Sequence, residues 1–187
     1  MQRRVSFSWR LGFLFLLLGT KLPSLHGQIL TWDTHEVLPG TELITLGPGL
    51  DFSSFNSEAL NLSYGDFSGE DVDISNSNFA TANVRYADFS QANVAGANVA
   101  GADLHHAILD GANFSMVNWT GTNLFNAQIE GTDLSGAIGL TAAQLYSSAN
   151  YQAQELSSIN RLRMNLSGNA MTGWNFSGIR MDGIFMH

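Results

Sequence analysis

The chain has 187 residues and no cysteine, and its 16 acidic residues outnumber its 8 Lys and Arg residues, giving a net charge of −8. The absence of cysteine excludes disulfides and thiolate metal sites. The negative balance disfavours binding to nucleic acid or to anionic membranes.

Residues 1–27 have the pattern of a secretory signal segment. A basic start is followed by a short apolar run at 11–18 and a stretch that ends at the small residue Gly27. The apolar run is short for a bilayer span, so we expect cleavage after Gly27 and a secreted or cell-envelope location, with a retained membrane anchor as the alternative. Cleavage would remove four basic residues and leave a net charge of −8 − 4 = −12 without any lysine: Arg3, Arg4, Arg10 and Lys21.

Residues 28–54 are expected to form an N-terminal cap. Turn-forming sequences recur here, and the Gly-Pro-Gly at 47–49 is predicted to be a turn because no phosphate-loop Gly-Lys-Ser/Thr follows it. A solenoid needs its end covered, and four apolar residues are expected to seal the first coil: Trp32, Leu43, Ile44 and Leu46.

The region 55–136 is dominated by a five-residue repeat that runs without a break from Val72 to Gly136. In its thirteen phrases the third residue is always apolar, the first is nearly always small, and the second is Asp or Asn in eleven. First and third positions share one side of an extended backbone, and the remaining positions favour turns. Short extended segments joined by frequent turns predict a solenoid of stacked coils around a continuous core.

The start of this region is irregular. Leu62 and Phe67 are expected to face the core. Seven positions, where the repeat would have five, separate Phe67 from Ile74, so two residues should bulge out within 68–71.

The phrase A-[DN]-[LF]-x-x resembles that of the pentapeptide-repeat family. The resemblance implies an all-β fold, a right-handed quadrilateral β-helix with about four pentapeptides per coil, in which residues twenty apart are stacked. The lead-in at 32–49 and the phrase at 140–156 are similar to those of an exported bacterial subgroup. The column Asp73, Asn93, Asn113, Asp133 never places Asp on Asp, which suits a period of twenty because opposed like charges are destabilising.

Residues 137–155 are predicted to leave the coil as one short helical excursion. Thr141 and Gln144 have the spacing of a capping box, and Tyr146 and Tyr151 are expected to dock the excursion on the coil. The repeat should resume at 156–187 with inner residues that include Leu166, Met171 and Phe176, and with Arg161 as a departure from the pattern. The sequence stops in frame at His187, which leaves two alternatives: an end-to-end homodimer or a longer natural chain.

One outward face differs from the others, which carry mostly small residues. At the fourth and fifth positions of three phrases one coil apart it presents a candidate interaction strip: Arg85, Tyr86, His105, His106, Phe125 and Asn126. Exposed aromatic rings beside Arg favour contact with a protein or a glycan; the alternative is chance decoration of the solenoid.

We predict no catalytic, cofactor or metal site. His105 and His106 have no evident third ligand, Asp110 and Glu130 form a like-charge pair one coil apart, and the acidic bulge near Asp71 lacks the calcium-loop pattern. We therefore expect a non-enzymatic, exported solenoid that acts as a structural or protein-interaction module and binds neither nucleic acid nor, after cleavage, membrane. The alternative is that of some acidic pentapeptide-repeat proteins, which mimic DNA and bind a topoisomerase; it requires a cytosolic chain.

Overall fold

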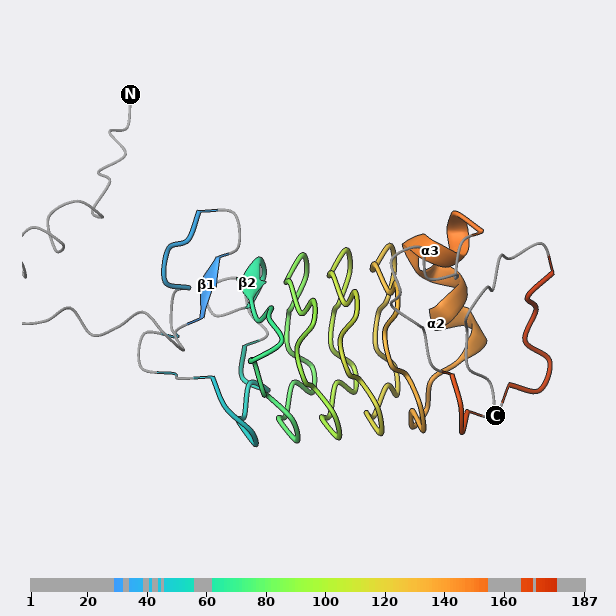
Figure 1. Cartoon of the computed structure of the whole chain (residues 1–187), viewed down its shortest axis with the longest axis horizontal. Helices are drawn as coiled ribbons and strands as arrows, with labels where there is room; N and C mark the ends of the chain where they lie inside the picture. The colour runs from blue at the N-terminus through green and yellow to red at the C-terminus, as the bar shows by residue number, and fades with distance from the viewer. Residues whose placement is uncertain are drawn as a thin grey trace, which may run out of the picture.

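The computed structural model describes residues 29–31, 34–38, 41, 44, 46–55, 62–154, 166–169 and 171–177. Their named elements are β1 (Leu30–Thr31), β2 (Gly65–Asp66), α2 (Ala142–Ser147) and α3 (Ala149–Gln152). Most of the chain is an elongated stack of coils, with β1 and β2 near one end and both helices near the other (Figure 1). In this part of the chain, no helix is both long and apolar enough to cross a membrane.

The coils have the predicted period of twenty residues. Parallel bridges join second positions that are twenty apart, from Asp73 with Asn93 through to Asn118 with Ile138. Backbone hydrogen bonds follow the same period: the Val84 N–H donates to Asp103 O, and the Asp103 N–H donates to Ala82 O, both at 3.0 Å. Four phrases therefore make one coil. The pairing consists of isolated bridges because a turn follows every two or three extended residues.

The core is built from the first and third positions. Small first-position residues such as Ala82 and large third-position residues such as Trp119 are almost fully buried. In the first coils Phe52 stacks on Phe79 at 4.6 Å and Phe67 on Phe89 at 4.7 Å between ring centroids. Edge-to-face contact between Phe67 and Phe79 links the two columns. This alternation of stacked and edge-on rings is a favourable arrangement for buried aromatic side chains.

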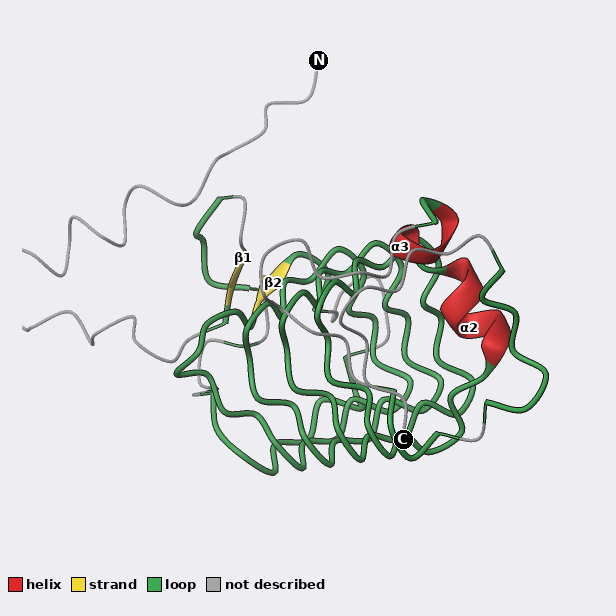
Figure 2. Cartoon of the chain, turned by 45° about the vertical axis from the view of Figure 1, so that its right-hand side comes forward, coloured by secondary structure: helices red, strands yellow, loops and turns green. Residues whose placement is uncertain are grey.

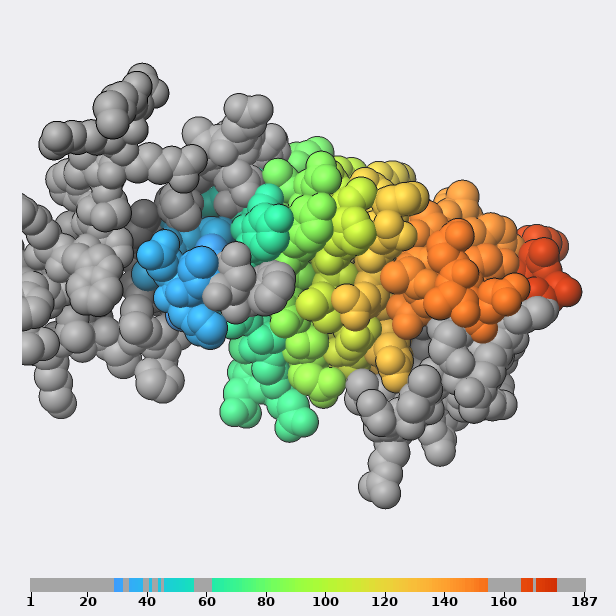
Figure 3. All heavy atoms as spheres, turned by 90° about the horizontal axis from the view of Figure 1, so that it is seen from above, coloured from blue at the N-terminus to red at the C-terminus, as the bar shows by residue number. Residues whose placement is uncertain are grey.

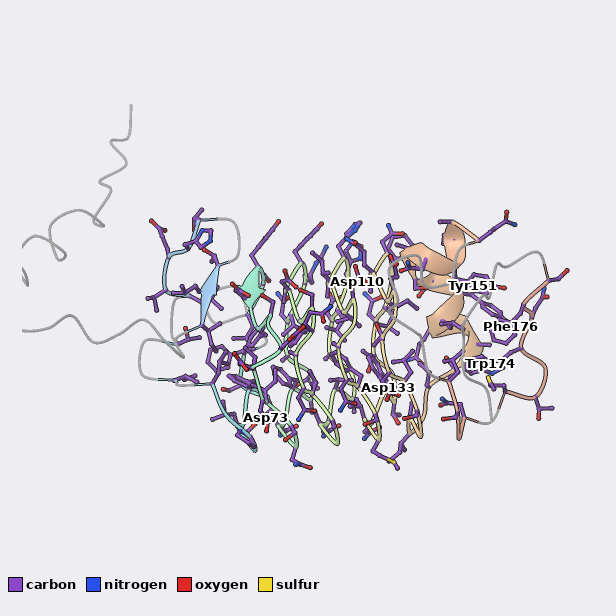
Figure 4. The ribbon with its side chains drawn as sticks, viewed as in Figure 1. Asp73, Asp110, Asp133, Tyr151, Trp174 and Phe176 are labelled. Atoms are coloured by element: carbon purple, nitrogen blue, oxygen red, sulfur yellow. The ribbon has the colours of Figure 1, made fainter. Side chains whose placement is uncertain are left out.

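The second-position side chains form hydrogen-bonded ladders along the outside of the stack. Their Oδ1 atoms accept the backbone N–H two residues later, as in the Ala95 N–H to Asn93 bond, which leaves the Asn Nδ2 group to donate to the preceding coil. Asn113 donates to Asn93, and Asn93 donates to Asp73, each at 3.1 Å. The ladder runs in one direction, so Asp73 serves as its acceptor end and Asp133, at the other end, has no amide to donate; both ends lie on the lower side of the stack in Figure 4. The ordering of Asp and Asn thus reflects donor supply as well as charge repulsion.

The predicted two-residue bulge is confirmed. Phe67 N–H donates to Asp88 O, 21 residues on, where the regular coil has 19, as in the bond from Phe89 to Ile108. Leu62 and Phe67 are fully buried, as predicted. The bridge between Asp51 and Asn78 spans 27 residues, so five more residues are inserted earlier in this first coil.

The cap contains two buried apolar residues beyond those predicted. Ile29 and Leu38 are buried and joined by a backbone hydrogen bond, and the predicted Ile44 and Leu46 are partly buried against the core. Trp32 and Leu43 lie outside the described residues. β1 pairs antiparallel with β2, so the cap is attached to the irregular first coil. The segment 47–49 makes the predicted turn, with Gly49 at a φ of 72°.

The capping box at Thr141 is confirmed, but the excursion contains two helices where we predicted one. Thr141 accepts the Gln144 N–H and donates its own N–H to the Gln144 side chain. Ser148 is extended at φ −67° and ψ 155°, so it ends α2 and begins α3, where its hydroxyl accepts the Tyr151 N–H. Figure 2 shows the two helices meeting at an angle.

The helices close the end of the regular coils. Leu145 is fully buried, and Gln144 Nε2 donates to the carbonyls of Trp119 at 2.7 Å and Thr122 at 2.9 Å. Tyr146 and Tyr151 pack against the core as predicted, and both hydroxyls also hydrogen-bond to the backbone of Asn175.

The repeat resumes above the last regular coil where the structure describes it. Gly136 N–H donates to Ser167 O at 2.8 Å, which places the buried Leu166 over Leu134. Met171 and Phe176 are partly buried. The other predicted inner positions lie outside the described residues: Leu156, Arg161, Met181 and Met186.

The one-way ladder predicts opposite effects for two single-atom exchanges. Asp133→Asn supplies a donor for Asn113 and should raise the melting temperature by about 2–4 °C, because one added hydrogen bond contributes about 1 kcal/mol. Asn93→Asp opposes two carboxylates and removes a donor, so it should lower the melting temperature at pH 7. Thermal unfolding followed by circular dichroism measures both, and shifts of the same sign would contradict a directional ladder.

Candidate functional site

The residues of the candidate strip are brought together on one side of the solenoid. Tyr86 stacks on His106 with ring centroids 5.0 Å apart and an angle of 12° between planes. His105 stacks on Phe125 at 5.2 Å, and the two imidazoles meet edge-to-face at 4.3 Å. The side chains therefore form one connected ladder of rings across three coils, as their spacing predicted.

One member of this ladder, Tyr64, was not predicted from the sequence. Its ring stacks on Tyr86 at 4.9 Å with only 5° between planes, and the residue is 40 % exposed. A period of twenty points to Asp66 below Tyr86, but the two-residue bulge makes the offset 22 at this coil. Applying the bulge to the column would have found Tyr64. We call the set Tyr64, Arg85, Tyr86, His105, His106 and Phe125 the aromatic strip.

The strip is bounded at both ends. Tyr64 directly precedes β2, and Asn126 donates its N–H to Ser147 O at the end of α2. Asn126 thus joins the strip to the helices and adds no ring to it. Viewed from above, the successive coils lie in green and yellow between the blue cap and the orange helical segment (Figure 3).

The corner that carries the strip has an unfavourable backbone conformation for its residues. Tyr64, Tyr86, His106 and Asn126 all have φ between 54° and 62°. The other corner columns of the described coils mix glycine with other residues at this left-handed position: Gly96 with Asn76 and Met116, Gly101 with Thr81, and Gly111 with Gln91. The strip column is the one among them without glycine. A left-handed conformation costs a residue with a Cβ roughly 1–2 kcal/mol, somewhat less for Asn. The large side chains are therefore kept at this corner against a conformational cost.

Charge on the strip is concentrated around Arg85. Its guanidinium lies 3.8 Å from an Asp103 carboxylate oxygen and 5.8 Å from the centre of the Tyr86 ring. Among the residues that the structure describes, Arg85 is the only Lys or Arg. Partial burial lowers the pKa of His105, and the neighbouring His106 and Arg85 lower it further, with Asp103 opposing them. His105 is therefore neutral at pH 7 and becomes cationic on acidification.

Asp110 and Glu130, the acidic pair on the adjacent face, are joined by a hydrogen bond that links two coils. Asp110, labelled in Figure 4, is half-buried, and its Oδ1 accepts the Glu130 backbone N–H at 2.8 Å. Burial raises the pKa of Asp110, and the charges of Glu130 and Asp88 raise it further. Within the described ranges no cluster of three or more His, Asp or Glu residues has the geometry to hold a metal ion. The absence of catalytic and cofactor sites stays a prediction.

Comparison with known proteins agrees with the repeat. Residues 73–111, 87–118 and 109–138 match the profile of a family described as pentapeptide repeats, in 8 copies. The repeats and the twenty-residue coil imply a right-handed quadrilateral β-helix. No curated protein matches the sequence significantly.

Solved structures give only distant similarity. A trypsin-treated variant of QnrB1, a plasmid-mediated fluoroquinolone resistance protein, is 16 % identical over 75 % of this chain and 72 % of its own, with a TM-score of 0.37. Rfr23, a pentapeptide repeat protein from the cyanobacterium Cyanothece 51142, is 26 % identical over 49 % of this chain and 71 % of its own, with a TM-score of 0.17. These TM-scores lie below 0.5 and carry no argument about function.

The raised pKa of Asp110 predicts a pH-dependent gain from Asp110→Asn. An acid whose pKa is raised by folding favours the native state below its usual value of 3.8 and opposes it once the pH exceeds the raised pKa. The amide keeps an acceptor for Glu130 N–H without the charge, so the variant should melt higher than the parent at pH 7. The gain should shrink below pH 4, where Asp110 is itself neutral.

Asp73→Asn is the matched control. The Asp73 carboxylate accepts the Ser75 N–H, and this and its other hydrogen bonds lower its pKa, so its charge favours the native state at pH 7. Thermal melts should therefore show a loss for this variant. A gain at both positions would mean that general acidity, rather than burial at Asp110, opposes folding.

Proposed function

We propose that this chain, whose residues 73–138 are pentapeptide repeats, is an exported interaction module that binds a partner through the aromatic strip and catalyses no reaction itself. The solenoid serves as a rigid support, and the strip is its recognition surface.

The observation that carries this proposal is the conformational cost at the strip's corner. Three ring-bearing residues, Tyr64, Tyr86 and His106, adopt left-handed backbone conformations in a corner column without glycine, whereas the other corner columns of the described coils contain glycine at some levels. Their rings lie on the outside of the coil and add nothing to the core. Local strain that persists at a surface position is typical of functional sites. Exposed aromatic residues beside an arginine have the composition of binding hot spots.

Export is supported by the pattern of residues 1–27 and by the acidic surface, which after cleavage has no lysine. Membership of the exported bacterial subgroup rests on the lead-in at 32–49 and the phrase at 140–156. Both are part of the proposal.

The topoisomerase-binding alternative has weaker support. A DNA mimic needs carboxylates that present negative charge in place of phosphates. Along the coils Asn outnumbers Asp at the second position, and the Asp oxygens accept backbone N–H groups and neighbouring amides, as Asp73 does. The strip, moreover, carries the one guanidinium of the described residues, and no phosphate mimic requires it. Location in the cell separates the two functions.

The strip predicts a position-specific cross-link. A photoreactive benzophenone amino acid at Phe125, which is 49 % exposed, should cross-link a partner in the native host. Adding Tyr86→Ala to this chain should reduce the cross-linked product, because Tyr86 lies in the same ring ladder. The same probe at Met116, which is 65 % exposed on another corner column, is the control and should give little product.

Stability must be unaffected for this test to report on binding. Tyr86→Ala with Phe125→Ala should shift the melting temperature by less than about 2 °C, since surface substitutions usually change stability by no more than about 0.5 kcal/mol. Equal cross-linking from Phe125 and Met116, or a product that survives Tyr86→Ala, would refute recognition by the strip.

Export predicts a processed chain outside the cytoplasm. Fractionation of the native host with N-terminal sequencing should find the protein in the envelope or medium, starting near Gln28. An uncleaved chain in the cytosol would refute export and make topoisomerase binding the first function to assay. An uncleaved chain in the membrane would replace secretion by anchored display of the same solenoid.

A further inference from the structure

The stacking within the aromatic strip limits what the strip can bind. Tyr86 has Tyr64 against one face and His106 against the other, at 4.9 and 5.0 Å. His105 and Phe125 cover one face of each other. A sugar ring, a proline or a base binds an aromatic residue through an uncovered ring face. Tyr86, in the middle of the ladder, therefore has no uncovered face, and a partner that crosses it meets the edge of its ring.

The edges of the two imidazoles carry N–H groups, and Arg85 adds a guanidinium next to them. The Arg85 side chain is 41 % exposed, and its ion pair with Asp103 is long at 3.8 Å. A second carboxylate can therefore approach the remaining guanidinium donors, of which arginine has five. These are the groups that bind carboxylates.

The charge of the rest of the molecule makes this location distinctive. The described part of the chain has eleven acidic residues and one arginine, and that arginine lies in the strip. An acidic partner is repelled by most of the described surface, and among the described residues the strip alone offers it a guanidinium. Four coils about 4.8 Å apart give the strip a length of about 14 Å, which an extended segment of four or five residues covers.

We propose that the aromatic strip binds an acidic, extended segment of a protein partner, with the guanidinium of Arg85 and the imidazole N–H groups of His105 and His106 as its carboxylate-binding groups. This inference rests on the proposed function, because it names the partner chemistry of the same surface. It replaces the glycan that the sequence left open.

Proton uptake follows from this arrangement. The groups that face the two imidazoles are Arg85, Asp103, Tyr86 and Phe125, and Asp103 is the one anion among them. Partial burial lowers the pKa of His105, and the neighbouring His106 and Arg85 lower it further, so charging this ring is unfavourable in the free protein. Carboxylates of a bound segment would offset the repulsion. Binding and protonation should therefore favour each other.

The test uses the full chain and two labelled peptides. One is a short fluorescein-labelled peptide that alternates Glu and Ser, and the other has every Glu replaced by Gln. Fluorescence anisotropy should show that the Glu peptide binds about tenfold more tightly at pH 5.5 than at pH 7.5, since a charged hydrogen bond to the His105 imidazolium forms only at the lower pH. The Gln peptide should bind weakly at both pH values.

Variants assign the effect to the strip. His105→Gln with His106→Gln should remove most of the pH dependence, and Arg85→Gln should weaken Glu-peptide binding at both pH values. His35→Gln removes a histidine of the cap and is the matched control, which should leave the pH dependence unchanged. Circular dichroism at both pH values confirms that each variant is folded.

Three results would overturn the inference. They are equal binding of the Glu and Gln peptides, pH dependence that survives the double histidine variant, and binding of a chito-oligosaccharide in place of the Glu peptide. If the cross-link from Phe125 persists, any of these results would mean that the strip binds a partner other than an acidic segment. Loss of that cross-link would instead refute the proposed function itself.

Discussion

The structure depends on the Asp or Asn side chain at the second position of most phrases, which can make two hydrogen bonds where it is Asn. The second-position oxygen accepts the backbone N–H two residues later, which fixes the turn, and the amide nitrogen donates to the coil before, as Asn98 does to Asn78. One residue therefore stabilises both the local turn and the stacking of coils. Backbone bonds repeated every coil then complete the pairing. Where the second residue is apolar, as at Ile108, Asp110 two positions later supplies an oxygen to the next coil.

Coil length decides which outward side chains meet, so insertions control function as well as shape. In the regular coils a period of twenty aligns Tyr86 with His106. In the first coil the two-residue bulge changes the offset, and Tyr64 in place of Asp66 lies against Tyr86. Without the bulge the ladder would end in a carboxylate beside Arg85. The bulge thus extends the ring ladder by one coil.

The regular part of the fold could be predicted because the same sequence pattern occurs in every phrase of the repeat. Each phrase gives the same inner, outer and turn positions, so the coil, the core and the neighbours within the strip follow from counting. The cap and the helices occur once, and no repetition marks their contacts. Ile29 and Leu38 could not be distinguished from Ile44 and Leu46 by hydrophobicity, since burial there depends on how the chain folds back across the first coil. Ser148 could have been placed inside a single helix, because its role as the cap of α3 depends on its extended backbone conformation.

In a solenoid, the residues that stabilise the coil and the residues that bind a partner can occupy different positions, as the four corners of this coil illustrate. At three corners of the described coils glycine shares the left-handed position with residues such as Asn76, Thr81 and Gln91. At the fourth corner Tyr64, Tyr86, His106 and Asn126 accept the same conformation at a cost. Because the core is supplied independently by the first and third positions, the coil can bear that cost without losing its packing. A repeat fold can in this way carry a conformationally unfavourable surface along one edge, and the edge where glycine is missing is the place to look for its partner.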